Sequence, residues 1–227
     1  MSKIEWTEKT WNPITGCTKV SAGCKNCYAE TIAKRFWGDR KFTDIRFHRH
    51  KLDEPLRRKK PTIYFVNSMS DMFHEDIVTM DIISIIEVMR EAKQHTFQIL
   101  TKRPARMREI LNVYNIPLNN VWFGVSIENQ ETANERRRSF EETKALCKFI
   151  SYEPALTDVK WDGYEFIDWI IAGGESGAKK RPNDFGWFRN TRDWANRNNV
   201  AFFMKQIDKV QPIPEDLFIR ETPVFKI

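Results

Sequence analysis

The sequence predicts an α/β fold, a full or partial (β/α) barrel of parallel strands. Short, nearly continuous apolar segments alternate along the chain with segments whose apolar residues have helical spacing. Such apolar strands are buried on both faces, as in parallel sheets, and their alternation with helices indicates βαβ units. Six strands fall between residues 62 and 206, and no strand–GxGxxG–helix unit occurs. A barrel therefore fits better than a dinucleotide-binding sheet.

The elements follow one another in a regular order. A short first strand is expected near Trp11–Ile14. The later strands end in polar residues, and we expect them at 61–73, 96–104, 120–129, 147–154, 168–177 and 200–206. Helices are expected at 80–94, 105–114, 130–146 and 185–199. The segment TDVKWDGYEFI is too short and too polar to form the helix expected before the strand at 168–177.

We expect one domain, spanning residues 1–227, because no linker divides the chain. Its additions to the barrel are a loop at about 11–30, a basic insertion without a strand at about 35–60, and a surface tail at 207–227.

Composition points to a cytoplasmic protein with an anionic partner. No run of about 18 apolar residues and no N-terminal apolar signal region occurs, so neither a membrane span nor a signal peptide is expected. Cytosolic thiols stay reduced, and clustered cysteines there indicate metal binding or catalysis more often than disulfides. The formal net charge of +6 favours an anionic partner, although many basic proteins bind no nucleic acid. The oligomeric state is not predicted.

The residues at the strand ends are of types that bind ligands. Strand carboxyl ends are where barrel active sites assemble. Turns built for structure alone favour Gly, Pro, Asn and Asp, whereas these ends are rich in Ser, Thr, Lys, Arg, Glu and Gln. The sequence therefore predicts a polar, charged opening above an apolar barrel.

Three cysteines, Cys17, Cys24 and Cys27, lie in one short segment with the spacing C-x6-C-x2-C. Zinc would need a fourth ligand such as His48 or His50. An electron-transfer iron–sulfur cluster needs a fourth cysteine, and Cys147 lies in an apolar strand typical of a core thiol. A four-iron cluster held by three thiolates leaves one iron open to a small chelating ligand, and it needs no fourth cysteine.

The chain resembles the radical S-adenosylmethionine enzymes in its N-terminal three-cysteine loop, the aromatic Tyr28 after the last cysteine, and the following βα barrel. More narrowly, it resembles a largely uncharacterised phage and bacterial family with a three-Cys motif. That resemblance spans about residues 4–206 and is carried by WNPITGCTKVSAGCKNCYAE, FVNSMSDMFHE, ILTKRP, VWFGVSIEN, FISYEPAL, IIAGGESG and FFMKQ.

The superfamily resemblance implies a [4Fe-4S] cluster on the three cysteines and S-adenosylmethionine as the second cofactor. It also implies an electron donor protein as a partner. The residues expected to contact S-adenosylmethionine are Tyr28, Ser68, Ser70, Asp71, Arg103, Ser126, Glu128, Gly173 and Gly174. The residues expected to act catalytically are Lys102, Glu153 and Glu175, with Lys102 an alternative to Arg103 for the cofactor carboxylate and Glu175 facing the substrate.

The insertion suggests DNA, RNA or a nucleotide as the substrate. It interleaves cations, which neutralise phosphates, with aromatic rings, which stack on exposed bases. A solvated basic surface is the alternative interpretation of the same residues. Two other functions also remain open: a zinc-stabilised barrel that binds nucleic acid without catalysis, and a metal-independent barrel hydrolase using Asp71, Glu128 and Glu153.

Overall fold

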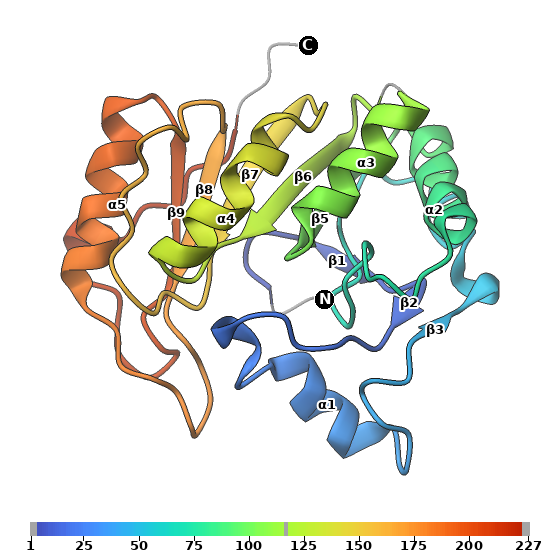
Figure 1. Cartoon of the computed structure of the whole chain (residues 1–227), viewed down its shortest axis with the longest axis horizontal. Coiled ribbons are helices and arrows are strands. Elements are labelled where there is room, and N and C mark those ends of the chain that lie inside the picture. Colours follow the sequence, from blue (N-terminus) through green and yellow to red (C-terminus); the bar gives the residue numbers. More distant parts are fainter. Residues whose placement is uncertain (1–3, 116–117, 224–227) are drawn as a thin grey trace.

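The chain folds as a half-barrel, in which a curved parallel sheet carries helices on its outer side (Figure 1). A computed structural model describes residues 4–115 and 118–223. The strands of the main sheet are arranged in the order β1-β4-β5-β6-β7-β8-β9, and every neighbouring pair is parallel. The predicted partial (β/α) barrel is therefore confirmed. No helix in the described ranges has the length and apolarity of a membrane span.

The strands of the main sheet are short, and the six predicted between residues 62 and 206 are all present. Their bounds are β1 Lys9–Trp11, β4 Ile63–Val66, β5 Thr96–Thr101, β6 Val121–Ser126, β7 Cys147–Tyr152, β8 Trp169–Gly173 and β9 Ala201–Gln206. The helices predicted between them are α2 Thr79–Glu91, α3 Pro104–Tyr114, α4 Gln130–Glu141 and α5 Phe185–Arg197. As expected, residues 153–168 between β7 and β8 contain no helix.

Two features of the N-terminal third differ from the sequence prediction. The helix α1 (Tyr28–Phe36) begins directly after Cys27, whereas no helix was expected there. It lies apart from α2–α5, at the bottom of Figure 1. The insertion also contains a two-residue strand, β3 (Arg46–Phe47), which pairs antiparallel with β2 (Ile14–Thr15). Two-residue strands lack the alternating pattern that identifies a strand in a sequence.

Successive residues of each strand point to opposite faces, and the core divides accordingly. Ile150 and Tyr152 of β7 face outwards and belong to the large core under the helices. Phe149, the residue before Ile150 on the same strand, faces inwards. The concave face of the half-barrel is covered by Trp6, Phe65, Phe149, Trp169, Ile171 and Phe203. The Trp6 ring lies 4.7 Å from Phe65 and 6.2 Å from Trp169, so the N-terminal segment fills the barrel interior.

The C-terminal segment covers the edge of the sheet at β9. The Met204 amide donates to the Ile219 carbonyl, and the Glu221 amide donates to the Phe202 carbonyl, so this segment runs antiparallel beside β9. A short 3-10 helix, η3 (Glu215–Leu217), precedes it and buries Leu217. The tail therefore protects an edge strand that would otherwise expose unpaired backbone groups.

Candidate functional site: the cysteine loop and the strand ends

The polar strand ends lie on the same concave face as the aromatic residues. Lys205 follows Phe203 by two positions, and Ser151 and Glu153 follow Phe149 by two and four. Residues separated by an even number along a strand share a face. We call the polar layer at the carboxyl ends of β4–β9 the mouth. It contains Asp71, Lys102, Arg103, Ser126, Glu128, Ser151, Glu153, Glu175 and Lys205.

The segment 16–28, here called the cysteine loop, crosses this mouth. It begins at the end of β4, where Gly16 forms a parallel bridge with Ser70 and its amide donates to the Met69 carbonyl. Within it lies a 3-10 turn, η1 (Ala22–Cys24). At its far end, the Tyr28 hydroxyl donates to the Ser68 carbonyl at 2.6 Å. The loop therefore leaves the β4 end, crosses the mouth and returns to the β4 end.

The first anchor of the loop is Thr18, which is held at the end of β5. The Arg103 guanidinium donates to Thr18 Oγ1 at 3.0 Å, and His74 Nε2 lies 2.7 Å from the same oxygen. The Asp76 amide donates to His74 Nδ1, so the imidazole is neutral and its Nε2–H donates to Thr18. Burial, followed by the positive charge of Arg103, lowers the pKa of His74, which is consistent with that neutral form.

The second anchor is Glu128 at the end of β6, which is fully buried. Ser21 donates to Glu128 Oε1 at 2.9 Å, and Lys102 Nζ lies 2.5 Å from the same oxygen. Arg136 from α4 donates to Oε2 at 3.1 Å. Burial alone would raise the pKa of Glu128, but Lys102 and Arg136 outweigh it and lower the pKa, so the carboxylate is charged.

The third anchor is Glu175, just after β8. Asn26 donates to Glu175 Oε2 at 2.8 Å, and the Arg181 guanidinium pairs with Oε1 at 2.5 Å. Arg181 also donates to the Ala22 carbonyl at 3.0 Å, so it bridges the strand end and the loop. Charged hydrogen bonds of this kind hold a geometry more firmly than neutral ones. The loop is thus fixed to three different strands.

The three thiols are free and half-buried, whereas Cys147 is fully buried in β7, as expected. Cys17 Sγ lies 3.9 Å from Arg103 Nη1, and Cys24 Sγ lies 3.8 Å from Ser21 Oγ. Burial, followed by the charge of Asp71, raises the pKa of Cys17 to about 11. In residues 4–115 and 118–223, no three or more His, Cys, Asp or Glu side chains are already positioned around one metal point.

The type and accessibility of the three thiols can be compared with what an iron–sulfur cluster and zinc require. All three thiols belong to one loop and are partly accessible, and His48, a candidate fourth zinc ligand, is held by Thr15 at 2.7 Å. Thiolates are the usual ligands of iron–sulfur clusters, and metal binding deprotonates a thiol that is otherwise neutral. Cys17, Cys24 and Cys27 therefore fit a cluster in residue type and accessibility.

The remaining predicted residues all lie at the mouth but have different surroundings. Asp71 Oδ1 accepts from the Thr101 hydroxyl and the Phe73 amide, and its Oδ2 accepts from the Lys102 amide and the Arg103 guanidinium. Ser70 donates to the Ile14 carbonyl and Ser68 to Asn12. The Ser126 carbonyl accepts from Arg136. A Cβ on Gly173 would lie 2.8 Å from Glu153 Oε1, and one on Gly174 would meet the Ile207 carbonyl at 2.0 Å.

Sequence reasoning missed several residues that hold the site together, including Thr18, Ser21, Asn26, Arg136 and Arg181. Their contacts join positions up to 159 residues apart, and no local pattern marks such pairs. Lys205, one of the polar residues at the strand ends, joins them: its Nζ lies 2.8 Å from Glu153 Oε1.

The basic insertion is more neutralised than its composition suggested. Arg46 pairs with Asp44, and Arg57 pairs with Asp53. The Arg40 guanidinium lies 4.1 Å from the centre of the Trp37 ring. The Arg58 carbonyl accepts from Gln94, just before β5, so this part of the insertion lies at the opposite end of the strands from the mouth.

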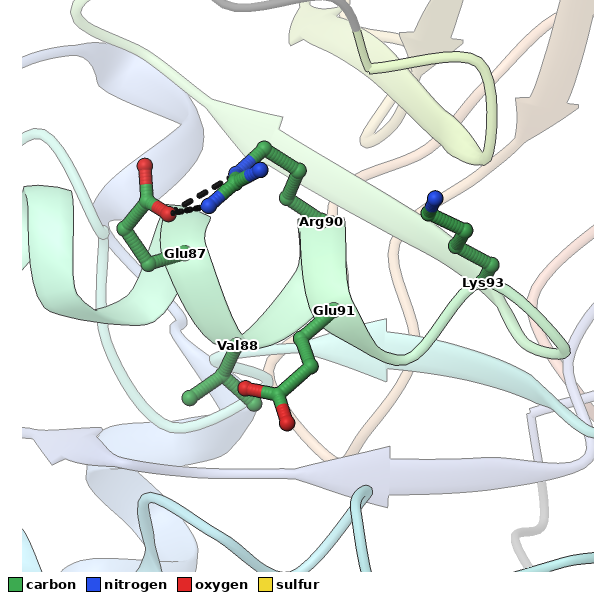
Figure 2. Close-up of a pocket in the computed structure, with 5 residues that line it drawn as sticks. All are labelled: Glu87, Val88, Arg90, Glu91 and Lys93. Carbon is green, nitrogen blue, oxygen red and sulfur yellow. Dashed lines mark hydrogen bonds and ion pairs between the residues drawn. The ribbon is translucent and has the colours of Figure 1, made fainter.

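A separate surface hollow lies at the carboxyl end of α2 (Figure 2). Its lining comes from the end of α2 and from Lys93, two residues beyond it: Glu87, Val88, Arg90, Glu91 and Lys93. Glu87 and Arg90 pair at 2.5 Å across it. Because a single segment supplies every lining group, this hollow lacks the convergence of side chains that marks a binding site.

The fold and site define the chain as an α/β half-barrel with a three-cysteine loop across its strand ends. The chain belongs to a family described as "Protein of unknown function (DUF5131)", whose model matches residues 1–216. Neither a curated protein nor a solved structure gives a significant match.

Proposed function

We propose that this protein is a radical S-adenosylmethionine enzyme in which Cys17, Cys24 and Cys27 hold a four-iron, four-sulfur cluster. The observation that carries the proposal is the position of the cysteine loop, anchored to the carboxyl ends of β5, β6 and β8. Barrel enzymes assemble their active sites at this edge. When bound, the cluster would supply the electron that cleaves the sulfonium bond of S-adenosylmethionine, generating a radical that abstracts hydrogen from the substrate.

The protein's own residues would fix the loop and keep water from the reaction. Arg103, Glu128 and Glu175 orient the loop, because each holds one of its anchors. The aromatic layer beneath the mouth closes the barrel interior, with Phe149 and Trp169 fully buried. A radical is protected when solvent is excluded from its surroundings. Tyr28, Ser68, Ser70, Ser126, Gly173 and Gly174 remain the proposed contacts to S-adenosylmethionine.

The proposed substrate is nucleic acid or a nucleotide, which the enzyme would modify or repair. Support comes from the net positive charge and from α1, beside the mouth, which exposes Tyr28, Ile32 and Phe36 on successive turns. Aromatic rings of this kind stack on unpaired bases, and nearby cations such as Arg35 neutralise phosphates. An electron donor protein is a required partner in this proposal.

A hydrolase built on Asp71, Glu128 and Glu153 is less well supported. Asp71 and Glu128 have both carboxylate oxygens engaged by neighbouring donors, and Glu128 is fully buried between two cations. A general acid or base must exchange a proton with the substrate, which requires an accessible oxygen. Asp71 and Glu128 are both buried, and neighbouring donors occupy their oxygens.

The function is tested by reductive cleavage of S-adenosylmethionine under anoxic conditions. We expect the reconstituted wild-type protein to release 5′-deoxyadenosine when a strong reductant is added, and Cys24→Ala to release none. Cys147→Ala is the matched control, because it removes a thiol of the same chain from the core. Release by Cys24→Ala at the wild-type rate would show that the proposed ligands are wrong.

A further inference from the structure

The charged residues of the mouth neutralise one another. With their direct partners Glu75, Arg136 and Arg181, these residues comprise five acidic and five basic side chains joined in ion pairs, so their formal charges cancel. The pairs are Asp71–Arg103, Glu75–Arg103, Lys102–Glu128, Arg136–Glu128, Arg181–Glu175 and Lys205–Glu153. A phosphate entering this layer would have to compete with a carboxylate for every one of these cations. The mouth therefore favours an uncharged polar group over a phosphate.

The pair formed by Glu153 and Lys205 has hydrogen-bonding capacity left over. A carboxylate can accept about four hydrogen bonds and an ammonium can donate three. Among the described residues, Glu153 accepts one contact from Lys205 at 2.8 Å and one from Ser151 at 3.2 Å. By contrast, Glu128 and Glu175 each accept at least three. Glu153 is also the most exposed of these three carboxylates, with 13% of its side chain accessible.

The layer beneath this pair is aromatic. Phe203 lies two residues before Lys205 on the same face, and Phe149 lies four residues before Glu153. Gly173 leaves the space in which Glu153 lies, because a Cβ there would approach Glu153 Oε1 to 2.8 Å.

We propose that Lys205 and Glu153 form a subsite that recognises the uncharged hydrogen-bonding edge of a nucleobase. Lys205 donates to a ring nitrogen or carbonyl of the base, and Glu153 accepts from the neighbouring N–H or amino group. The phosphates stay outside the mouth. This inference rests on the proposed function for the identity of the substrate as nucleic acid or a nucleotide.

The test measures nucleoside binding to the anoxically reconstituted full chain, saturated with S-adenosylmethionine and kept free of reductant. The probes are the four deoxynucleosides and their 5′-monophosphates, and their binding is measured by isothermal titration calorimetry. We expect at least one nucleoside to bind, and its monophosphate to bind within about threefold of it. Lys205→Met and Glu153→Gln should each weaken nucleoside binding by about tenfold or more, as expected for loss of a charged hydrogen bond.

Two further variants separate a loss of binding from a loss of folding. Lys209→Met, on an exposed residue just beyond β9, is the matched control and should bind as the wild type does. The double variant Glu153→Gln/Lys205→Met leaves no unpaired charge, and it should fold with a normal unfolding midpoint while binding nucleosides as weakly as the single variants. The inference is overturned if no nucleoside binds the wild type, if the double variant binds normally, or if monophosphates bind more than tenfold tighter than nucleosides.

Iron and sulfide are measured on the same samples, so that the two proposals can fail separately. Wild-type protein that carries the cluster but binds no nucleoside contradicts the subsite alone. Protein without iron and sulfide contradicts the proposed function, whatever its nucleoside binding.

Discussion

Gly23 of the cysteine loop lies directly against Glu128 at the end of β6. A Cβ on residue 23 would be only 2.4 Å from Glu128 Cγ and 2.6 Å from its Oε1. The loop can therefore approach the strand end only because residue 23 has no side chain. Close to this contact, the Ser21 hydroxyl donates a hydrogen bond to Glu128 Oε1 at 2.9 Å, which fixes the orientation of the loop. The contact between Gly23 and Glu128 therefore makes the position of the neighbouring Cys24 depend on a buried carboxylate.

Gly23→Ala should displace the loop. We expect a loss of about 1–3 kcal/mol in the free energy of unfolding, the usual cost of overpacking, measured by urea denaturation. Cluster loading should also fall, because Cys24 is the next residue. Adding Glu128→Asp, which is one methylene shorter, should recover part of the loading. Wild-type stability and loading in Gly23→Ala would show that the loop does not need this close approach.

Glu128→Gln should be strongly destabilising. It leaves Lys102 and Arg136 without their shared carboxylate in a buried position. Removing one member of a buried ion pair typically costs about 3–5 kcal/mol. The control is Glu142→Gln, whose exposed carboxylate pairs with Arg138 and Arg108 on the surface, and little change is expected there. Equal unfolding midpoints for the two variants in urea would contradict the assigned role of Glu128.

Arg181→Gln should loosen the loop more than it destabilises the fold. Arg181 bridges Glu175 and the Ala22 carbonyl, and its side chain is partly accessible. We expect faster hydrogen exchange in residues 19–27 and weaker retention of iron, with an almost unchanged unfolding midpoint. Lys179→Gln is the control, because its contact to the loop is made by its backbone carbonyl. Unchanged exchange in Arg181→Gln would mean that the third anchor is dispensable.

His74 should make stability depend on pH. Its pKa is lowered in the folded protein by burial and then by Arg103, with Glu75, Asp76 and Asp71 opposing them. The unfolded chain therefore binds protons first as the pH falls below about 6.5, and stability is lost from there downwards through the folded pKa. The pKa of His48 is also lowered, by burial and Lys51, so it contributes with the same sign.

Urea denaturation between pH 7.5 and 5.5 measures this effect. His74→Gln should reduce the slope of the unfolding free energy against pH, and adding His48→Gln should reduce it further. A slope that is the same in wild type and His74→Gln would contradict the neutral, buried state of this histidine.

The main fold was predictable because its signals are local. Apolar strands such as IYFV in β4 and WIIAG in β8 are buried on almost every residue, and the helices between them have clear periodicity. The helix α1 was missed because its outward face exposes Tyr28, Ile32 and Phe36 and only Ala29 and Ala33 are buried. Such a helix has no apolar stripe facing a core, and its stability depends on its contacts beside the mouth.

The site was only partly predictable. The strand-end residues could be placed together because parallel strands end at one edge, and the structure puts Lys102 and Glu128 in contact. How the loop crosses that edge could not be read from the sequence, since Asn26–Glu175 and Ala22–Arg181 join distant residues. The ion pairing within the mouth could not be predicted either, because the composition gives the number of charged residues but not which of them pair.

The most direct test is the iron and acid-labile sulfide content of anoxically purified and reconstituted protein. We expect about four iron atoms and four sulfides per chain in the wild type and in Cys147→Ala, and loss of the cluster in Cys17→Ala, Cys24→Ala and Cys27→Ala. Protein that takes up no sulfide, or that holds one zinc ion on these cysteines instead, would contradict it.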